Sequence, residues 1–235
     1  MTRFDLYTHI HKAVRSLFFD AIQTVGSTDF AREGEVEKTI ATLRRTIRLT
    51  RSHAEHEDRA IHPVLHRFAP ELAADLEAGH DRFDGMDREL ETALERLAGA
   101  NEATRISLGR RIHDLLGVLV ADHLQHMAQE EARANRVLWA NLSDAELIGI
   151  QDAIMSQIPP AELAEWMELA LAFGSFGECA GLLAGLRAAV PAEVFGPLTA
   201  AGRARMGEER WRECLAAAER MLAGQVAASV QGQVQ

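Results

Sequence analysis

The chain has 235 residues, with 25 Lys and Arg residues against 35 Asp and Glu residues, and its formal net charge at pH 7 is −10. A composition that is 47% hydrophobic and 26% charged excludes a disordered chain and indicates an ordinary globular protein. The acidic balance, without a stripe of Lys and Arg, argues against nucleic acid as a partner.

The cellular compartment is predicted from features that the sequence lacks. No run of 18 apolar residues occurs, so no membrane span is predicted, and the first residues do not read as a signal peptide. Two cysteines cannot supply a disulfide framework, and we expect Cys179 and Cys214 to be small buried side chains. The expectation is a reduced, cytoplasmic protein.

The first half of the chain predicts four long helices. Prolines are absent before Pro63 and between Pro70 and Pro159, and the strong helix formers Ala, Leu, Glu and Arg dominate. Breaks are expected around residues 26–29, between Pro63 and Pro70, and before Asn101, which can cap the helix that follows. The predicted helices cover residues 3–25, 33–61, 70–98 and 102–138.

After Trp139 the predicted helices become shorter. Ser143 and Glu146 have the spacing of a capping box, and Gly and Pro separate the later segments. The predicted fold is all-α: an up-down-up-down four-helix bundle over residues 1–140, then a smaller all-helical region over 141–235. We interpret that region as an interaction or oligomerisation module, able to form a homodimer. Its predicted helices cover residues 143–157, 160–173, 176–188, 192–200 and 207–223.

Histidine and glutamate form two pairs with helical spacing in the predicted bundle. His53 and Glu57 lie four residues apart, and so do His126 and Glu130, so each pair occupies one face of its helix. A single pair of this kind is weak evidence. Two pairs, on the second and fourth predicted helices, are stronger evidence for a metal site.

Helical periodicity turns these side chains toward the core. His126 shares its face with leucines and isoleucine, His11 shares its face with Tyr7 and Phe18, and His80 borders the apolar stripe of its helix. Buried carboxylates beside four imidazoles require a compensating cation, because desolvating an unpaired charge costs several kcal/mol. Nitrogen and oxygen donors suit iron, manganese or zinc. The alternative is a bundle whose buried histidines only hydrogen-bond to glutamates.

The order of these residues is itself a repeat. Twice, a single histidine is followed by a His-x-x-x-Glu pair. His11 precedes His53 by 53 − 11 = 42 residues, and His80 precedes His126 by 126 − 80 = 46 residues. This order resembles the hemerythrin-like (HHE cation-binding) domains, on the stretches that begin at His11, His53, His80 and His126. The resemblance covers residues 1 to about 140. It implies a centre of two iron ions, oxo- or hydroxo-bridged, with zinc or manganese as substitutes, and ligand roles for His11, His53, Glu57, His80, His126 and Glu130.

One departure from that family pattern concerns the third helix. Oxygen-carrying members place a second histidine four residues after the first, whereas here Asp84 follows His80. Six ligands are therefore predicted, and a seventh is left open between Asp84, His56, His123 and water. We expect His56 and His123 to border the site, and we expect His9, His62, His66 and His113 at the surface or at helix ends.

Three functions are compatible with such a centre. The leading hypothesis is a di-iron binding protein that binds or senses oxygen, nitric oxide or iron. The second is a redox enzyme that reduces peroxide or nitric oxide at an open coordination position. The third is a helical interaction module held together by the metal.

Overall fold

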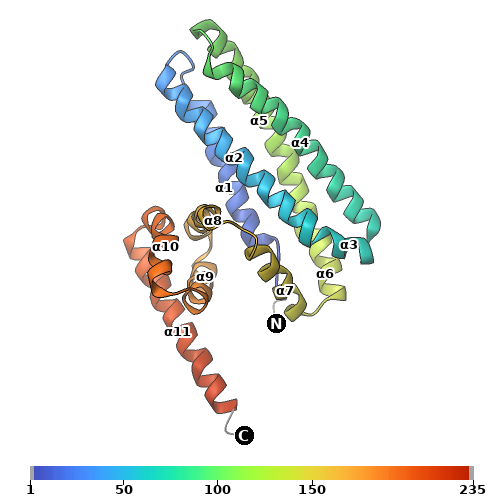
Figure 1. Ribbon diagram of the computed structural model, residues 1–235, viewed down its shortest axis with the longest axis vertical. Helices are drawn as coiled ribbons and strands as arrows, with labels where there is room; N and C mark the ends of the chain where they lie inside the picture. Colours follow the sequence, from blue (N-terminus) through green and yellow to red (C-terminus); the bar gives the residue numbers. More distant parts are fainter. Residues whose placement is uncertain (1–2, 233–235) are drawn as a thin grey trace. The chain divides into compact units, whose positions relative to one another are not determined.

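The computed structural model describes residues 3–232, with side chains through residue 224, and all regular elements in that part of the chain are helical (Figure 1). The predicted all-α class is therefore confirmed. None of the described helices is both long and apolar enough to cross a bilayer. In chain order the elements are α1 (Thr8–Ser27), α2 (Glu33–Ala60), α3 (His62–Phe68), α4 (Pro70–Ala98), α5 (Glu102–Gln129), the π-helical segment η1 (Glu130–Ala134), α6 (Asn135–Asn141), α7 (Asp144–Met155), α8 (Pro160–Phe173), α9 (Phe176–Ala189), α10 (Ala192–Met206) and α11 (Glu208–Gly232).

Helices α1, α2, α4 and α5 form the predicted four-helix bundle. Each packs against two neighbours, α1 and α4 both contacting α2 and α5, so the four helices enclose one core. Short connections join α1 to α2 and α4 to α5, which makes both pairs antiparallel (Figure 1). Apolar side chains from all four helices are fully buried between them, among them Phe18, Leu43, Leu90 and Ile112. The bundle therefore encloses an apolar core to which all four helices contribute.

The first helix begins five residues later than predicted, at Thr8. The carboxylate of Asp5 accepts hydrogen bonds from the backbone N–H groups of Tyr7 and Thr8, and these bonds stabilise the start of the helix. Arg3 fixes that segment by donating to the carbonyl oxygens of Trp139 and Leu142. The start of α1 is thus tied to the end of the bundle at which α6 lies.

The segment between Pro63 and Pro70, expected to be a break, contains the short helix α3. Pro63 stands in its first turn, where a missing N–H costs nothing because the first N–H groups of a helix have no intrahelical partner. The chain therefore changes direction at Ile61 without leaving helical geometry. This change brings His62 into the interior of the bundle, where it is fully buried.

The fourth predicted helix is not continuous to residue 138. At Glu130 the backbone widens into the π-helical segment η1, and the N–H of Asn135 bonds to the carbonyl of Glu130, five residues earlier. The extra residue shifts the phase of the following helix, so that Glu130, Ala134 and Asn135 are all buried. Such bulges are rare and occur often at functional sites.

Two compact units make up the chain, residues 1–157 and residues 158–235. The first unit extends beyond residue 140, the boundary expected from the sequence, because α7 belongs to it. Leu147 of α7 packs in one apolar cluster with Tyr7 and Leu138, and Asp144 pairs with Arg3. The predicted capping box of Ser143 and Glu146 opens this helix.

The second unit consists of α8 to α11 and has its own apolar core. Helix α10 packs against α8, and α11 packs against α9. Both cysteines are free and buried there, as predicted. Helix α10 continues to Met206, beyond the predicted end at 200, and ends at Gly207, whose φ of 90° suits glycine.

Candidate metal centre

The bundle brings together all six residues that the sequence singles out. Ligand-type atoms of His11, His53 and Glu57 lie within 4.8 Å of one another, and so do those of Glu57, His80, His126 and Glu130. Glu57 belongs to both groups, so the two form one cluster. The residues come from α1, α2, α4 and α5 and from the first position of η1.

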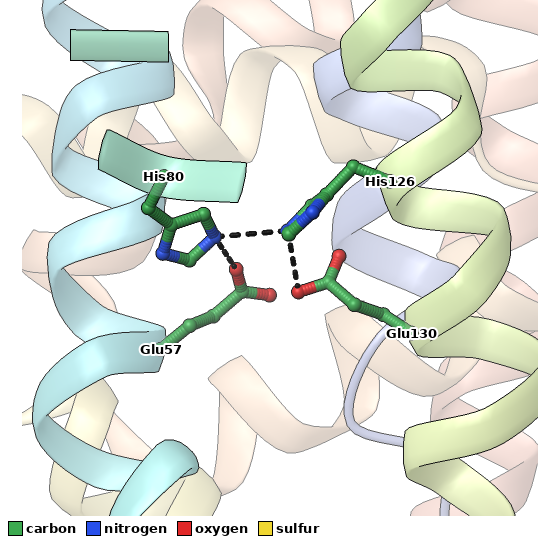
Figure 2. A group of neighbouring side chains, drawn as sticks. All are labelled: Glu57, His80, His126 and Glu130. Atoms are coloured by element: carbon green, nitrogen blue, oxygen red, sulfur yellow. Dashed lines mark hydrogen bonds and ion pairs between the residues drawn. The ribbon is translucent and has the colours of Figure 1, made fainter. Parts of the chain in front are cut away.

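Figure 2 shows the larger group, in which four side chains point toward a common centre. The Nε2 atoms of His80 and His126 are 3.0 Å apart. Each histidine also faces a carboxylate: His80 Nε2 lies 3.5 Å from Glu57 Oε2, and His126 Nε2 lies 3.1 Å from Glu130 Oε1. Two imidazole nitrogens and two carboxylates thus converge from three helices and the bulge.

His11 and His53 complete the cluster from α1 and α2. His11 Nε2 lies 3.6 Å from Glu57 Oε1 and 3.5 Å from Glu130 Oε2, so it stands between the two carboxylates. His53 Nε2 lies 3.3 Å from Glu57 Oε1, one helical turn along α2. In both pairs the i, i+4 spacing places the histidine beside the glutamate one turn later, His53 beside Glu57 and His126 beside Glu130.

The polar atoms at the centre of this cluster are buried without good hydrogen bonds. Among the described side chains, neither oxygen of Glu57 or Glu130 has a hydrogen-bond partner, and the same holds for His11 Nε2. The side chains of Glu57 and Glu130 are only 4% and 0% exposed. Buried carboxylates of this kind are costly unless a cation or a network of donors neutralises them.

The charges of the cluster act strongly on one another. Burial, and then the charge of Glu57, raises the pKa of Glu130. Burial also disfavours the charged form of Glu57, but the facing histidines, His53 first, hold its pKa well below the usual value. For His11, burial opposes protonation, yet Glu131 and the two carboxylates raise its pKa to about 9. The cluster therefore has a strong affinity for positive charge.

Two carboxylates that the sequence analysis did not single out hold the outer nitrogens of these histidines. Asp58 Oδ1 lies 2.7 Å from His80 Nδ1, and Glu131 Oε1 lies 2.9 Å from His11 Nδ1. An ionised carboxylate only accepts hydrogen bonds, so each Nδ1 carries a proton, and Nε2 is the nitrogen that would give its lone pair to a cation at the centre. This is the arrangement that commonly orients metal-binding histidines.

His62 lies at a helix end, one of the two positions expected for it, but the burial of its side chain was not predicted. His62 begins α3, but it is fully buried and its ring stacks on that of His80, with centroids 5.1 Å apart. Its Nδ1 lies 2.9 Å from Asp58 Oδ1, so the same carboxylate faces both rings. Position relative to a helix end could not reveal this, because the turn at Ile61 directs the side chain inward.

The remaining residues that the sequence singled out lie around the cluster. Asp84, one of the candidates for a seventh ligand, is exposed, and its carboxylate lies 3.8 Å from the guanidinium of Arg51. Its neighbour on the same helix, Asp87, lies one turn further along α4 and is buried. His56 and His123 are buried but belong to neither group of candidate ligands. The hydroxyl of Tyr7 is buried without a hydrogen-bond partner among the described residues, and burial and the charges of Glu130 and Glu57 raise its pKa well above 10.

This donor set fits a pair of transition-metal ions. It offers imidazole nitrogen and carboxylate oxygen without thiolate, which suits iron, zinc or manganese. The inward Nε2 atoms and the unsatisfied carboxylate oxygens are the groups that bound cations would use.

Comparison with known proteins gives one family. The model of the hemerythrin HHE cation-binding domain matches residues 2–137, which include the whole cluster. A search of curated proteins finds no match to the chain.

Proposed function

Because the chain belongs to the hemerythrin family, whose HHE domain binds cations, we propose that its bundle holds two iron ions and that the loaded centre binds a small ligand such as dioxygen or nitric oxide. The observation that carries this proposal is the pair of buried carboxylates, Glu57 and Glu130, whose oxygens lack hydrogen bonds and face a ring of imidazoles. Without bound cations, the burial of these two carboxylates would lower the stability of the folded protein.

The two groups of donors suggest how the ions would be shared. His11 and His53 would serve one ion with Glu57, and His80 and His126 would serve the other with Glu57 and Glu130. Glu57 occurs in both groups, and His11 faces both carboxylates, so the carboxylates are the natural link between the ions. When bound, iron supplies a redox-active Lewis acid that can take up a small ligand.

The protein's own contribution is to orient the donors and exclude water. Asp58 and Glu131 accept hydrogen bonds from Nδ1 of His80 and His11, so that Nε2 of each ring would be the atom offered to a cation. The fully buried rings of Tyr7, directly before α1, and of Phe18, within α1, flank His11 along the chain. Such a dry setting strengthens every interaction between the donors and a cation.

Metal content tests this proposal. Protein reconstituted anaerobically with ferrous iron and freed of excess metal should retain two iron ions per chain. On exposure to air it should develop the near-ultraviolet absorption of a ferric dinuclear centre. Parallel reconstitution with zinc and manganese shows whether the site discriminates among metals. Less than one iron per chain would contradict the proposal.

A redox enzyme is the second candidate, and the position of Asp84 favours it. This residue stands where oxygen carriers have a further histidine, but it lies near Arg51 and is exposed. The loaded centre would therefore keep coordination positions open for a substrate such as peroxide or nitric oxide. Turnover assays with each oxidant, compared with the His126→Ala variant, separate this candidate from simple binding. No turnover above that of the variant would remove it.

A further inference from the structure

His123 is a buried polar residue beside the metal cluster that the proposed ligand set does not use. It lies on α5, one turn before His126, and each of the two residues is only 7% exposed. Its Nε2 atom is buried and has no hydrogen-bond partner among the side chains that the structure describes. A buried polar atom left unpaired destabilises the folded state, so its presence calls for a partner.

Aromatic contacts fix the ring of His123 in place. It stacks on Phe83 with centroids 3.6 Å apart and an interplanar angle of 20°, and the ring of Phe18 lies 4.7 Å away. Phe83 also meets His126 edge to face, at 5.1 Å and 86°. One phenylalanine therefore contacts both histidines, and it holds the His123 ring next to the ligand-bearing turn of α5.

The surroundings of His123 are those of the metal cluster. Burial lowers its pKa well below the usual value, and the charges that act on it next are those of His126, His53 and His80. An imidazole has at least one N–H to donate in either protonation state. His123 joins none of the groups of residues whose ligand atoms lie within 4.8 Å of one another, so it is placed beside the cluster rather than within it.

We propose that His123 donates a hydrogen bond from Nε2 to a small anionic ligand, of the azide type, held at the metal centre; this inference rests on the proposed function. A ligand that binds a cation through one atom carries negative charge on its outer atoms, and an N–H donor in a dry site stabilises that charge. Phe18 and Phe83 keep water from competing for the donor. His123 is thus a specificity residue for the exogenous ligand.

Azide titration of the iron-loaded full chain tests this role. The wild type is compared with His123→Leu, which keeps an apolar side chain against Phe83 but removes the donor, and with His123→Gln, whose amide nitrogen restores one. Affinity is followed by the charge-transfer band of the azide complex. The His123→Leu variant should bind azide about tenfold more weakly or worse, and His123→Gln should recover part of the loss.

Two controls separate this role from a structural one. His113→Leu changes an exposed histidine of the same helix, 63% exposed at its side chain, and should leave azide affinity unchanged. In the presence of chelator, His123→Leu should unfold at the same temperature as the wild type or higher, because the substitution removes an unpaired buried polar atom. Circular dichroism confirms that each variant is folded.

The outcomes distinguish this inference from the proposed function. Equal azide affinity of the wild type and His123→Leu, both with two iron ions, would overturn the role of His123 and leave the di-iron proposal intact. Absence of azide binding to the loaded wild type would overturn it as well. Loss of iron from His123→Leu would show a metal ligand instead of a donor. A wild type that binds less than one iron would overturn the proposed function itself.

Discussion

Gly79 lies directly against the imidazole of His126: a Cβ atom added to Gly79 would stand 2.6 Å from Nδ1 of that ring. The missing side chain lets α4 approach α5 at the height of the metal cluster. Because Gly79 precedes His80 in the chain, the same turn of α4 supplies one candidate ligand and makes room for another. Close packing of these two helices is therefore a condition for the geometry of the site.

Replacement Gly79→Ala should displace the ring of His126 and weaken metal binding by about tenfold or more, as misplacing a ligand commonly does. Iron or zinc affinity measured by competition with a chelator checks this. Gly85→Ala is the matched control, because an added Cβ there meets nothing within 4 Å. It should raise the free energy of unfolding by about 0.5–1 kcal/mol without changing metal affinity.

Removing the carboxylate that faces His80 should also weaken the centre. In Asp58→Ala the Nδ1 of His80 loses its acceptor, so its tautomer and orientation are no longer fixed, and metal affinity should fall about 10–100-fold. Glu55→Ala, on the same helix, removes an exposed carboxylate that pairs with Arg59 at the surface and serves as the control. Equal metal affinities for the two variants would contradict the assigned role of Asp58.

Asp87 makes stability depend on pH. Burial raises its pKa to about 7, so the folded state keeps its proton from about pH 4, where the unfolded carboxyl titrates, up to about pH 7. The folded state binds more protons in this window, and the contribution of Asp87 to stability falls as pH rises through it.

Asp87→Asn should therefore gain stability relative to the wild type between pH 5 and pH 8, by on the order of 2 kcal/mol. Chemical denaturation at several pH values, with Asp84→Asn as the exposed control, measures the difference. A constant difference between variant and wild type across this range would show that Asp87 is ionised throughout.

Truncation tests where the bundle unit ends. A chain ending at Gln157 should fold and keep the metal affinity of the full protein, because all six candidate ligands and α7 are retained. A chain ending at Ala140 lacks Leu147 and Asp144, so it should unfold at a lower temperature. If the two truncated chains unfold at the same temperature, the stable bundle unit ends at residue 140 instead.

The sequence could predict the helices and the inward-facing donors because both depend on local periodicity. His53 and Glu57, and likewise His126 and Glu130, share a helical face, and four helices that each carry a histidine can bring them to one height. These features need only spacing along a helix. The structure brings the six residues together as that spacing suggested.

The supporting carboxylates could not be found in this way. Asp58 and Glu131 each directly follow a candidate ligand, so periodicity places them about 100° away from the core-facing glutamate. Asp58 reaches His80 across the interface between α2 and α4, and Glu131 reaches His11 next to the π-helical segment. Both contacts depend on helix packing and on a backbone bulge, which no local pattern specifies.

The most direct measurement of the central claim is the gain in thermal stability that iron gives the wild type, compared with the gain in Glu130→Gln. If the buried carboxylates exist to hold cations, saturating iron should raise the unfolding temperature of the wild type strongly and that of Glu130→Gln much less. In chelator the two should unfold within a few degrees of each other, since burial already favours the neutral form of Glu130. An equal rise in unfolding temperature with iron in both proteins would contradict the claim that the buried carboxylates hold cations.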